Sequence, residues 1–159
     1  MERDYRADQV SIVDFETARV AALEYRGNPK FIGIAVRKLI EWRRLNNLPP
    51  KRSATYNIVY RGDGAEVHYD LCAATGRDVA SNDFGVVGKT IPAGRCAVIR
   101  HIGSDEGIGE VAAYLRARWL PTSGENLRDF PMYFQRVRFP PEVPADEMCI
   151  RDRRREDHQ

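Results

Sequence analysis

The pattern of apolar and polar residues divides the start of the chain into short strand-like segments and one amphipathic helix. Residues 10–13 and 19–25 are short apolar runs, and the second, RVAALEY, stops near a glycine. Runs of this length that end at turn residues are typical of β-strands. Apolar residues then recur at helical spacing, which predicts a helix over residues 29–45 with Asn28 as its cap and Pro29 in its first turn.

A hairpin is predicted after this helix, and the second half of the chain then repeats the same order of elements. The peptides TYNIVYR and AEVHYDLCA flank the turn GDG, which is a hairpin pattern. The peptide GRCAVIRHIG predicts a strand and MYFQRVRF predicts another. Between them, SDEGIGEVAAYLRARWLP predicts a helix that is capped at Ser104 or Asp105 and ends at Pro121. A last strand is expected near residues 147–150.

Each half of the chain therefore has the order strand, helix, strand, strand. ARVAALEYRG and GRCAVIRHIG share an arginine, an alanine and a glycine in place. One such module covers only one face of its sheet with a helix. The expected fold is α+β: two repeated βαββ modules related by a pseudo-twofold axis, forming an antiparallel sheet with two main helices and a central ligand cleft. The alternative is a plain two-layer α+β domain whose inner face is only core.

Length and composition fit one globular domain. The chain has 159 residues, of which 43% are hydrophobic and 30% are charged. We expect a single domain over residues 10–147, with repeat one at about 10–80 and repeat two at about 85–150. The charged segment 151–159 has no apolar residue to bury, so it is predicted to be a disordered tail.

Several function classes find no support in the sequence. The apolar runs are far shorter than a membrane span, the N-terminus MERDYRADQV lacks an apolar signal core, and the three cysteines form no CxxC pair, so a cytoplasmic protein is expected. The three histidines have no cysteine or carboxylate at ligand spacing, so no metal and no cofactor is predicted. The peptide GVVGKT ends like a phosphate-binding loop but lacks the first glycine of that motif.

Positive charge gathers around the end of the first predicted helix. Six basic residues stand there against Glu41 alone, namely Arg37, Lys38, Arg43, Arg44, Lys51 and Arg52. A solvated helix face and its exit loop would explain them, and a surface for an acidic partner is the alternative. The net charge of the whole chain, +2, is too small to indicate direct binding to nucleic acid.

The chain also contains the peptides RVAALEYRGNP, VHYDLC, GRCAVIRHIGS, RWLPTSG and FPMYFQRV, in that order. Together they resemble the GyrI-like, or gyrase-inhibitor-like, family of effector-binding domains, and the resemblance extends over about residues 10–147. Such domains occur alone or at the C-terminus of AraC-type and MerR-type transcription regulators. The resemblance implies two βαββ units with a pocket between them that binds bulky, often cationic, aromatic compounds.

One position departs from the pattern of that family. Many members carry an aromatic residue and a glutamate on the strand after the second helix, where this chain has Phe134 and Gln135. A tyrosine often found two places later is Val137 here. An amide cannot neutralise a buried cation or take up a proton at neutral pH. Since family members that resemble hydrolases of strained-ring compounds rely on that glutamate, no enzyme activity is predicted.

Six residues are predicted to line the ligand site. Tyr133 shares a strand face with Gln135 because side chains alternate along a strand. Trp119 ends the second helix, and a core or rim aromatic is the alternative for it. Tyr60 lies beside the glycine-rich turn, and a tyrosine and a histidine hold equivalent strand ends in the two repeats. The predicted ligand-binding set is Tyr25, Tyr60, His101, Trp119, Tyr133 and Gln135.

The sequence therefore favours a stand-alone binding module for hydrophobic, aromatic small molecules, whether or not these are cationic. A protein-interaction module of the gyrase-inhibitor type is the alternative, with the basic cluster as its surface, and a hydrolase is the third candidate. The expected partners are a small-molecule ligand and, in the alternative, a protein, without direct contact to nucleic acid or membrane. A monomer and a homodimer both fit the sequence.

Overall fold

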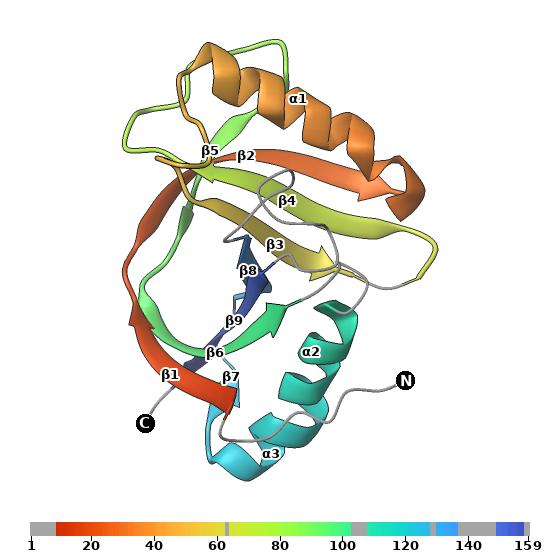
Figure 1. Cartoon of the computed structure of the whole chain (residues 1–159), viewed down its shortest axis with the longest axis vertical. Coiled ribbons are helices and arrows are strands. Elements are labelled where there is room, and N and C mark those ends of the chain that lie inside the picture. Colours follow the sequence, from red (N-terminus) through yellow and green to blue (C-terminus); the bar gives the residue numbers. More distant parts are fainter. Residues whose placement is uncertain (1–8, 63, 103–107, 128–129, 137–148, 158–159) are drawn as a thin grey trace. The chain divides into compact units, whose positions relative to one another are not determined.

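The computed structural model divides the chain into two compact units (Figure 1). Unit 1 consists of Met1–Phe15 and Ala93–Gln159, and unit 2 of Glu16–Pro92. The structure describes residues 9–62, 64–102, 108–127, 130–136 and 149–157. Both units combine antiparallel strands with helix, so the predicted α+β class is confirmed.

Unit 2 contains four antiparallel strands in the order β3-β4-β2-β5. They are β2 (Ala18–Gly27), β3 (Thr55–Arg61), β4 (Val67–Ala74) and β5 (Val87–Ile91). The predicted hairpin is the β3–β4 pair, and β2 pairs with both β4 and β5. Strand β5 was not predicted, since most of it lies in the GVVGKT segment that ends like a phosphate-binding loop.

The helix of unit 2 begins where the sequence predicts. A short 3-10 turn, Pro29–Phe31, leads into α1 (Ile32–Leu45). The side chain of Asn28 accepts a hydrogen bond from the backbone N–H of Lys30 at 2.9 Å. Pro29 sits in the first turn, where a missing N–H leaves no helical bond unmade.

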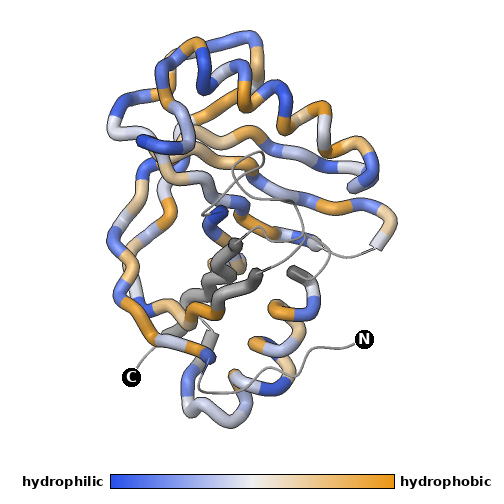
Figure 2. Tube along the Cα trace, in the orientation of Figure 1, coloured by the Kyte–Doolittle hydropathy of each residue, from blue (hydrophilic) through white to orange (hydrophobic). Residues whose placement is uncertain are grey.

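Helix α1 covers one face of the unit 2 sheet. The core between them consists of Ala21, Leu23, Ala35, Leu39, Trp42, Leu71 and Val86. Hydrophobic and hydrophilic residues alternate along α1 in Figure 2, and several apolar ones stay exposed, among them Ile34 at 56% and Ile40 at 58%. Because successive strand residues point to opposite faces, Glu24 and Asp70 lie on the face turned away from α1.

Arg43 is a buried part of α1. The residue is only 5% exposed. Its guanidinium donates hydrogen bonds to the carbonyl oxygens of Leu48 at 2.8 Å and Ser53 at 2.7 Å, and to Oγ1 of Thr55 at 2.6 Å. Burial lowers the pKa of the Arg43 guanidinium to about 10, which leaves it charged at neutral pH. The interpretation of Arg43 as part of a solvated basic surface was wrong, because the exit loop folds back over it and supplies two acceptors, while Thr55 at the start of β3 supplies the third.

Among the described residues of unit 1, four antiparallel strands follow the order β1-β6-β9-β8, and a fifth, short strand pairs beside this path. They are β1 (Val10–Phe15), β6 (Gly94–Ile102), β8 (Met132–Arg136) and β9 (Cys149–Asp157), and the short β7 (Asn126–Leu127) also pairs with β9. Its helical part comprises α2 (Ile108–Tyr114), a π-helical turn (Leu115–Trp119) and α3 (Leu120–Ser123). The core beneath it consists of Ile99, Val111, Tyr114 and Leu115.

The sequence predicts that the helical segment of unit 1 ends at Pro121, but the segment continues past this residue. Pro121 lies in the first turn of α3, where its missing N–H can be accommodated. The segment ends instead at Gly124, whose φ of 76° is in the left-handed region that glycine adopts without a Cβ clash. The predicted cap residues Ser104 and Asp105 lie outside the described residues.

The charged tail is a strand over most of its length, so the prediction of a disordered segment 151–159 was wrong for its first seven residues. Strand β9 pairs with β6 on one side and with β8 on the other; Arg153, for example, lies opposite Val98 and Tyr133. Every residue other than proline carries a backbone donor and acceptor. A strand bonded on both sides therefore forms without an apolar run of its own.

The two units have the same strand order. β3-β4-β2-β5 in unit 2 corresponds to β8-β9-β6-β1 in unit 1, with α1 after β2 and α2 after β6. Strand β1 precedes β2 but pairs with β6, and β5 precedes β6 but pairs with β2. The predicted repeats, 10–80 and 85–150, therefore each contain one strand that belongs to the other unit.

Candidate ligand-binding site

A buried carboxylate lies on the face of the unit 2 sheet that is turned away from α1. The side chain of Asp70, on β4, is 0% exposed. Its Oδ2 accepts hydrogen bonds from the hydroxyl of Tyr60 and from Nζ of Lys89, both at 2.7 Å. Its Oδ1 is buried and has no hydrogen-bond partner within the described part of the chain. Such an acceptor is uncommon, because its desolvation is not compensated.

Lys89 supplies the positive charge beside this carboxylate. It belongs to β5, and β2 lies between β5 and β4, so its side chain reaches Asp70 across one strand. The Lys89 side chain is 36% exposed, which keeps its ammonium partly hydrated. Its Nζ also lies 5.7 Å from the centre of the Tyr60 ring, within the range of cation–π attraction. Asp70 and Lys89 thus form a pair without net charge.

Tyr60 is the aromatic side chain of this cluster. Its ring stacks on His68 with the ring centres 4.5 Å apart and the planes at 27°, and the residue is 42% exposed. Burial, and then the hydrogen bond to Asp70, raise the pKa of the Tyr60 phenol, so it stays a donor at neutral pH. Nε2 of His68 lies 2.8 Å from Oε2 of Glu24, and this contact lowers the pKa of the Glu24 carboxyl.

These side chains suit the recognition of an organic ligand. A buried carboxylate oxygen can accept a hydrogen bond from a bound donor or stabilise its positive charge, and the adjoining tyrosine offers an aromatic surface. Among the described residues, no three or more His, Cys, Asp or Glu side chains gather closely enough to hold a metal ion.

The other predicted site residue of unit 2, Tyr25, points to the opposite face of the sheet. It packs against the core beneath α1, and its hydroxyl donates to the backbone carbonyl of Asn28. Its neighbour Glu24 faces the side of Asp70. The structure therefore brings Tyr60 to the carboxylate cluster and places Tyr25 with the helix.

The remaining predicted site residues belong to unit 1. Tyr133 is fully buried in its core, with its hydroxyl 3.3 Å from Sγ of Cys96 and its ring centre 5.3 Å from that of Phe15. Gln135 is half-buried, two residues further along β8. Trp119 packs at the margin of the core beneath α2, in agreement with the alternative that it is a core or rim aromatic.

His101 is the sixth member of the predicted set. It lies in β6 opposite Ile150 of β9, and its side chain is outside the described part of the structure. A common cleft for residues from both repeats stays a prediction.

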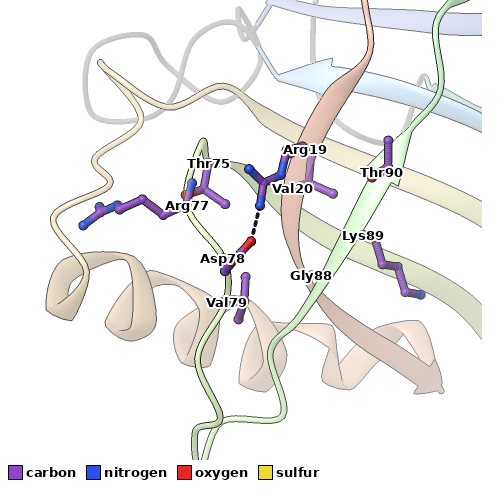
Figure 3. Close-up of a pocket in the computed structure, with 9 residues that line it drawn as sticks. All are labelled: Arg19, Val20, Thr75, Arg77, Asp78, Val79, Gly88, Lys89 and Thr90. Atoms are coloured by element: carbon purple, nitrogen blue, oxygen red, sulfur yellow. Dashed lines mark hydrogen bonds and ion pairs between the residues drawn. The ribbon is translucent and has the colours of Figure 1, made fainter.

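A hollow of about 250 Å³ opens beside β2 and β5 in unit 2 (Figure 3). Its lining residues are Arg19, Val20, Thr75, Arg77, Asp78, Val79, Gly88, Lys89 and Thr90. Arg19 is bound to Asp78 at 2.5 Å, and Arg77 donates to a backbone carbonyl, while the side chain of Lys89 points away from the Arg19–Asp78 pair. Because these arginines already have protein partners, the hollow is a weaker ligand site than the Asp70 cluster.

Comparison with known proteins agrees with the resemblance read from the sequence. The family model of the GyrI-like small molecule binding domain matches residues 8–150. The chain belongs to the GyrI-like family.

Relatives of this GyrI-like domain include regulators. The probable transcriptional regulator YgiV of Escherichia coli (strain K12) is 31% identical over 130 residues, which cover 79% of this chain and 81% of YgiV. The C-terminal domain of EcmrR has the same fold, with a TM-score of 0.77 at 12% identity over 94% of this chain and 98% of that domain. In the EcmrR–DNA complex, the match spans 57% of the EcmrR chain.

A further structure with this fold contains a ligand. SAV2435 bound to tetraphenylphosphonium matches with a TM-score of 0.61 at 6% identity, over 93% of each chain. At such identities, the solved structures establish the fold of the GyrI-like domain.

Within its described residues, no helix combines the length and apolar character that crossing a membrane requires.

Reasoning from the sequence missed Asp70 and Lys89 of the GyrI-like domain. A signal for Asp70 was present, because this aspartate is the only carboxylate in the run VHYDLCAA and is followed directly by four residues without charge. No signal for Lys89 was available, since its contact with Asp70 depends on the pairing of the unpredicted strand β5 with β2.

Proposed function

We propose that this GyrI-like domain is a stand-alone binding module for hydrophobic, aromatic small molecules, cationic ones included, and that it binds them without chemical turnover. The proposed site is a cleft between the two βαββ repeats, and the proposed role is to sense or sequester the ligand in the cytoplasm. The observation that carries the proposal is the buried Asp70 carboxylate beside the exposed ring of Tyr60, in a member of a small-molecule-binding family.

Further observations support the ligand class, the role and the absence of turnover. SAV2435, which has the same fold, binds the aromatic cation tetraphenylphosphonium. The curated relative YgiV is a probable transcriptional regulator, and EcmrR carries the same fold in a DNA complex, which agrees with a sensing role. Gln135 stands where many family members carry a glutamate, so this chain lacks the group on which a hydrolase of that type would rely.

A thermal-shift screen against cationic, neutral and anionic aromatic compounds tests this function. A ligand present at a hundred times its dissociation constant should add about 2.7 kcal/mol to the free energy of unfolding, which raises Tm by about 5–10 °C for a chain of this size. The Gln135→Glu variant should shift the preference toward cations, because a half-buried carboxylate gains from a paired positive charge.

The control for this screen is Gln9→Glu, which adds the same charge at an exposed residue and should leave the preference unchanged. An unaltered preference in Gln135→Glu would place residue 135 outside the ligand site. Chromatography of the recovered ligand should show no product, and a product whose formation needs the protein would favour the hydrolase. If no compound stabilises the protein, small-molecule binding of this class is contradicted.

One observation favours a protein-interaction module as the second candidate. Helix α1 and the 3-10 turn before it expose apolar side chains at 56–58% each, and α1 also exposes Arg37 and Lys38. The apolar residues are Phe31 in the turn and Ile34, Ile40 and Leu45 in α1. This candidate predicts that the purified chain inhibits supercoiling by DNA gyrase, the partner that the family name implies, and that Arg37→Glu with Lys38→Glu abolishes the inhibition. Arg61→Glu, a charge reversal at an exposed residue of β3, is the control for a surface outside α1. Absence of inhibition by the unaltered chain would exclude gyrase as the partner.

A further inference from the structure

The Asp70 carboxylate has one oxygen with two donors and one with none. Oδ2 accepts from Tyr60 and from Lys89, whereas Oδ1 is buried without a partner among the residues that the structure describes. A neutral aromatic ring without an N–H or O–H group offers such an oxygen no strong donor, and a neutral N–H or O–H group forms a weaker bond than a charged one. An N–H group that carries positive charge satisfies it best, because hydrogen bonds between two charged groups are the strong ones.

The two members of the ion pair differ in how firmly the fold holds them. Asp70 lies on β4, which pairs with β2 and β3 on its two sides, and its side chain is fully buried. Lys89 comes from β5, which pairs only with β2 in the described part of unit 2, and its side chain is partly exposed. A flexible four-carbon stem allows the ammonium to move into water at small cost. The carboxylate is therefore the fixed partner and the lysine the exchangeable one.

Tyr60 would contact a bound cation in the same way as it contacts the Lys89 ammonium. Its hydroxyl donates to Asp70, and its ring lies 5.7 Å from the Lys89 ammonium, while His68 stacks on the ring. A ligand cation at the position of the ammonium would gain the same carboxylate and the same aromatic ring. Exchange of one cation for another keeps the charge of Asp70 compensated throughout, so no buried carboxylate is left unpaired.

We propose that Asp70 binds the N–H-bearing positive charge of a protonated aromatic amine or amidine, and that Lys89 is a built-in competitor that this ligand displaces from Asp70. The inference rests on the proposed small-molecule function and specifies its ligand class and its control. In the unliganded protein, Lys89 compensates the buried charge. On binding, the positive charge of the ligand compensates the Asp70 carboxylate in place of Lys89, and an N–H group of the ligand donates to Oδ1.

Lys89→Met tests the competition, since it removes the charge while keeping a side chain of similar length. With the fluorescent aromatic diamidine 4′,6-diamidino-2-phenylindole as the probe, the Kd of the full chain should fall at least about tenfold. The same variant should have a lower Tm without the probe, because Asp70 is then uncompensated. Lys30→Met removes an exposed lysine of the same unit and should change neither the Kd nor the Tm.

Asp70→Asn tests the carboxylate. This variant should weaken diamidine binding at least about tenfold, and Lys89→Met added to it should bring no gain in affinity. If the asparagine variant does not fold, Tyr60→Phe replaces it; losing one donor to Oδ2 should tighten the Lys89 contact and weaken diamidine binding. Tetraphenylphosphonium, which lacks N–H groups, is the control ligand. In Asp70→Asn, or in Tyr60→Phe if that variant is used instead, its affinity should change less than the affinity for the diamidine.

Weaker or unchanged diamidine binding in Lys89→Met would overturn the proposal, and so would a gain that persists without Asp70. In either case, neutral aromatic compounds that still stabilise the unaltered chain would leave the small-molecule function standing. If no aromatic compound of any charge stabilises the unaltered chain, the proposed function itself is contradicted.

Discussion

Replacement of Arg43 by methionine is expected to lower the free energy of unfolding by about 3–5 kcal/mol, and the Tm by about 10 °C. The guanidinium donates to three acceptors, the carbonyls of Leu48 and Ser53 and the hydroxyl of Thr55, all within 2.8 Å. Methionine fills a similar volume but leaves these buried acceptors without donors. Thermal and urea unfolding followed by circular dichroism measures the effect.

Arg44 provides the matched control for this variant. Its side chain is 67% exposed and pairs with Glu41 one turn earlier in α1. Arg44→Met should therefore change the stability by less than about 0.5 kcal/mol, as exposed ion pairs usually do. Arg43→Lys should still destabilise the protein, because one ammonium cannot reach three acceptors in the geometry of a planar fork. Equal stabilities of Arg43→Met and Arg44→Met would show that the exit loop does not depend on Arg43.

Truncation of the chain after Ile150 is expected to destabilise unit 1 by more than about 3 kcal/mol. The deletion removes β9 from Arg151 onward, and with it five register pairs to β6, from Arg151 to Arg155, and three to β8. Strands β6 and β8 would then present unpaired backbone groups along their facing edges. The family match ends at the same residue, so the deletion leaves the matched segment intact.

Hydrogen exchange followed by mass spectrometry locates the effect of this truncation. Peptides from β6 and β8 should lose protection, whereas peptides from β2 and β4 should keep it, because the deletion touches no strand pair of unit 2. A chain that ends at Asp157 retains every described pair of β9 and should match the full chain. If the chain that ends at Ile150 is as protected and as stable as the full chain, the terminal segment contributes nothing to the sheet.

Local signals in the sequence determined the elements of unit 2 that depend on neighbouring residues. The cap by Asn28, the proline at the start of α1 and the turn between β3 and β4 act within a few residues of the chain. Backbone geometry and capping are local interactions, so they can be read from short stretches. The order of such elements, with the peptides that carry it, also sufficed to identify the family.

The tertiary structure alone decided which strands are neighbours and which charges are buried. The exchange of β1 and β5 between the units could not be read from the sequence, because any strand offers the same backbone groups to any other. The contact between Lys89 and Asp70 follows from that exchange. Arg43 and Arg44 are adjacent and chemically identical, yet one is buried and the other exposed, because only Arg43 meets the loop that returns over α1.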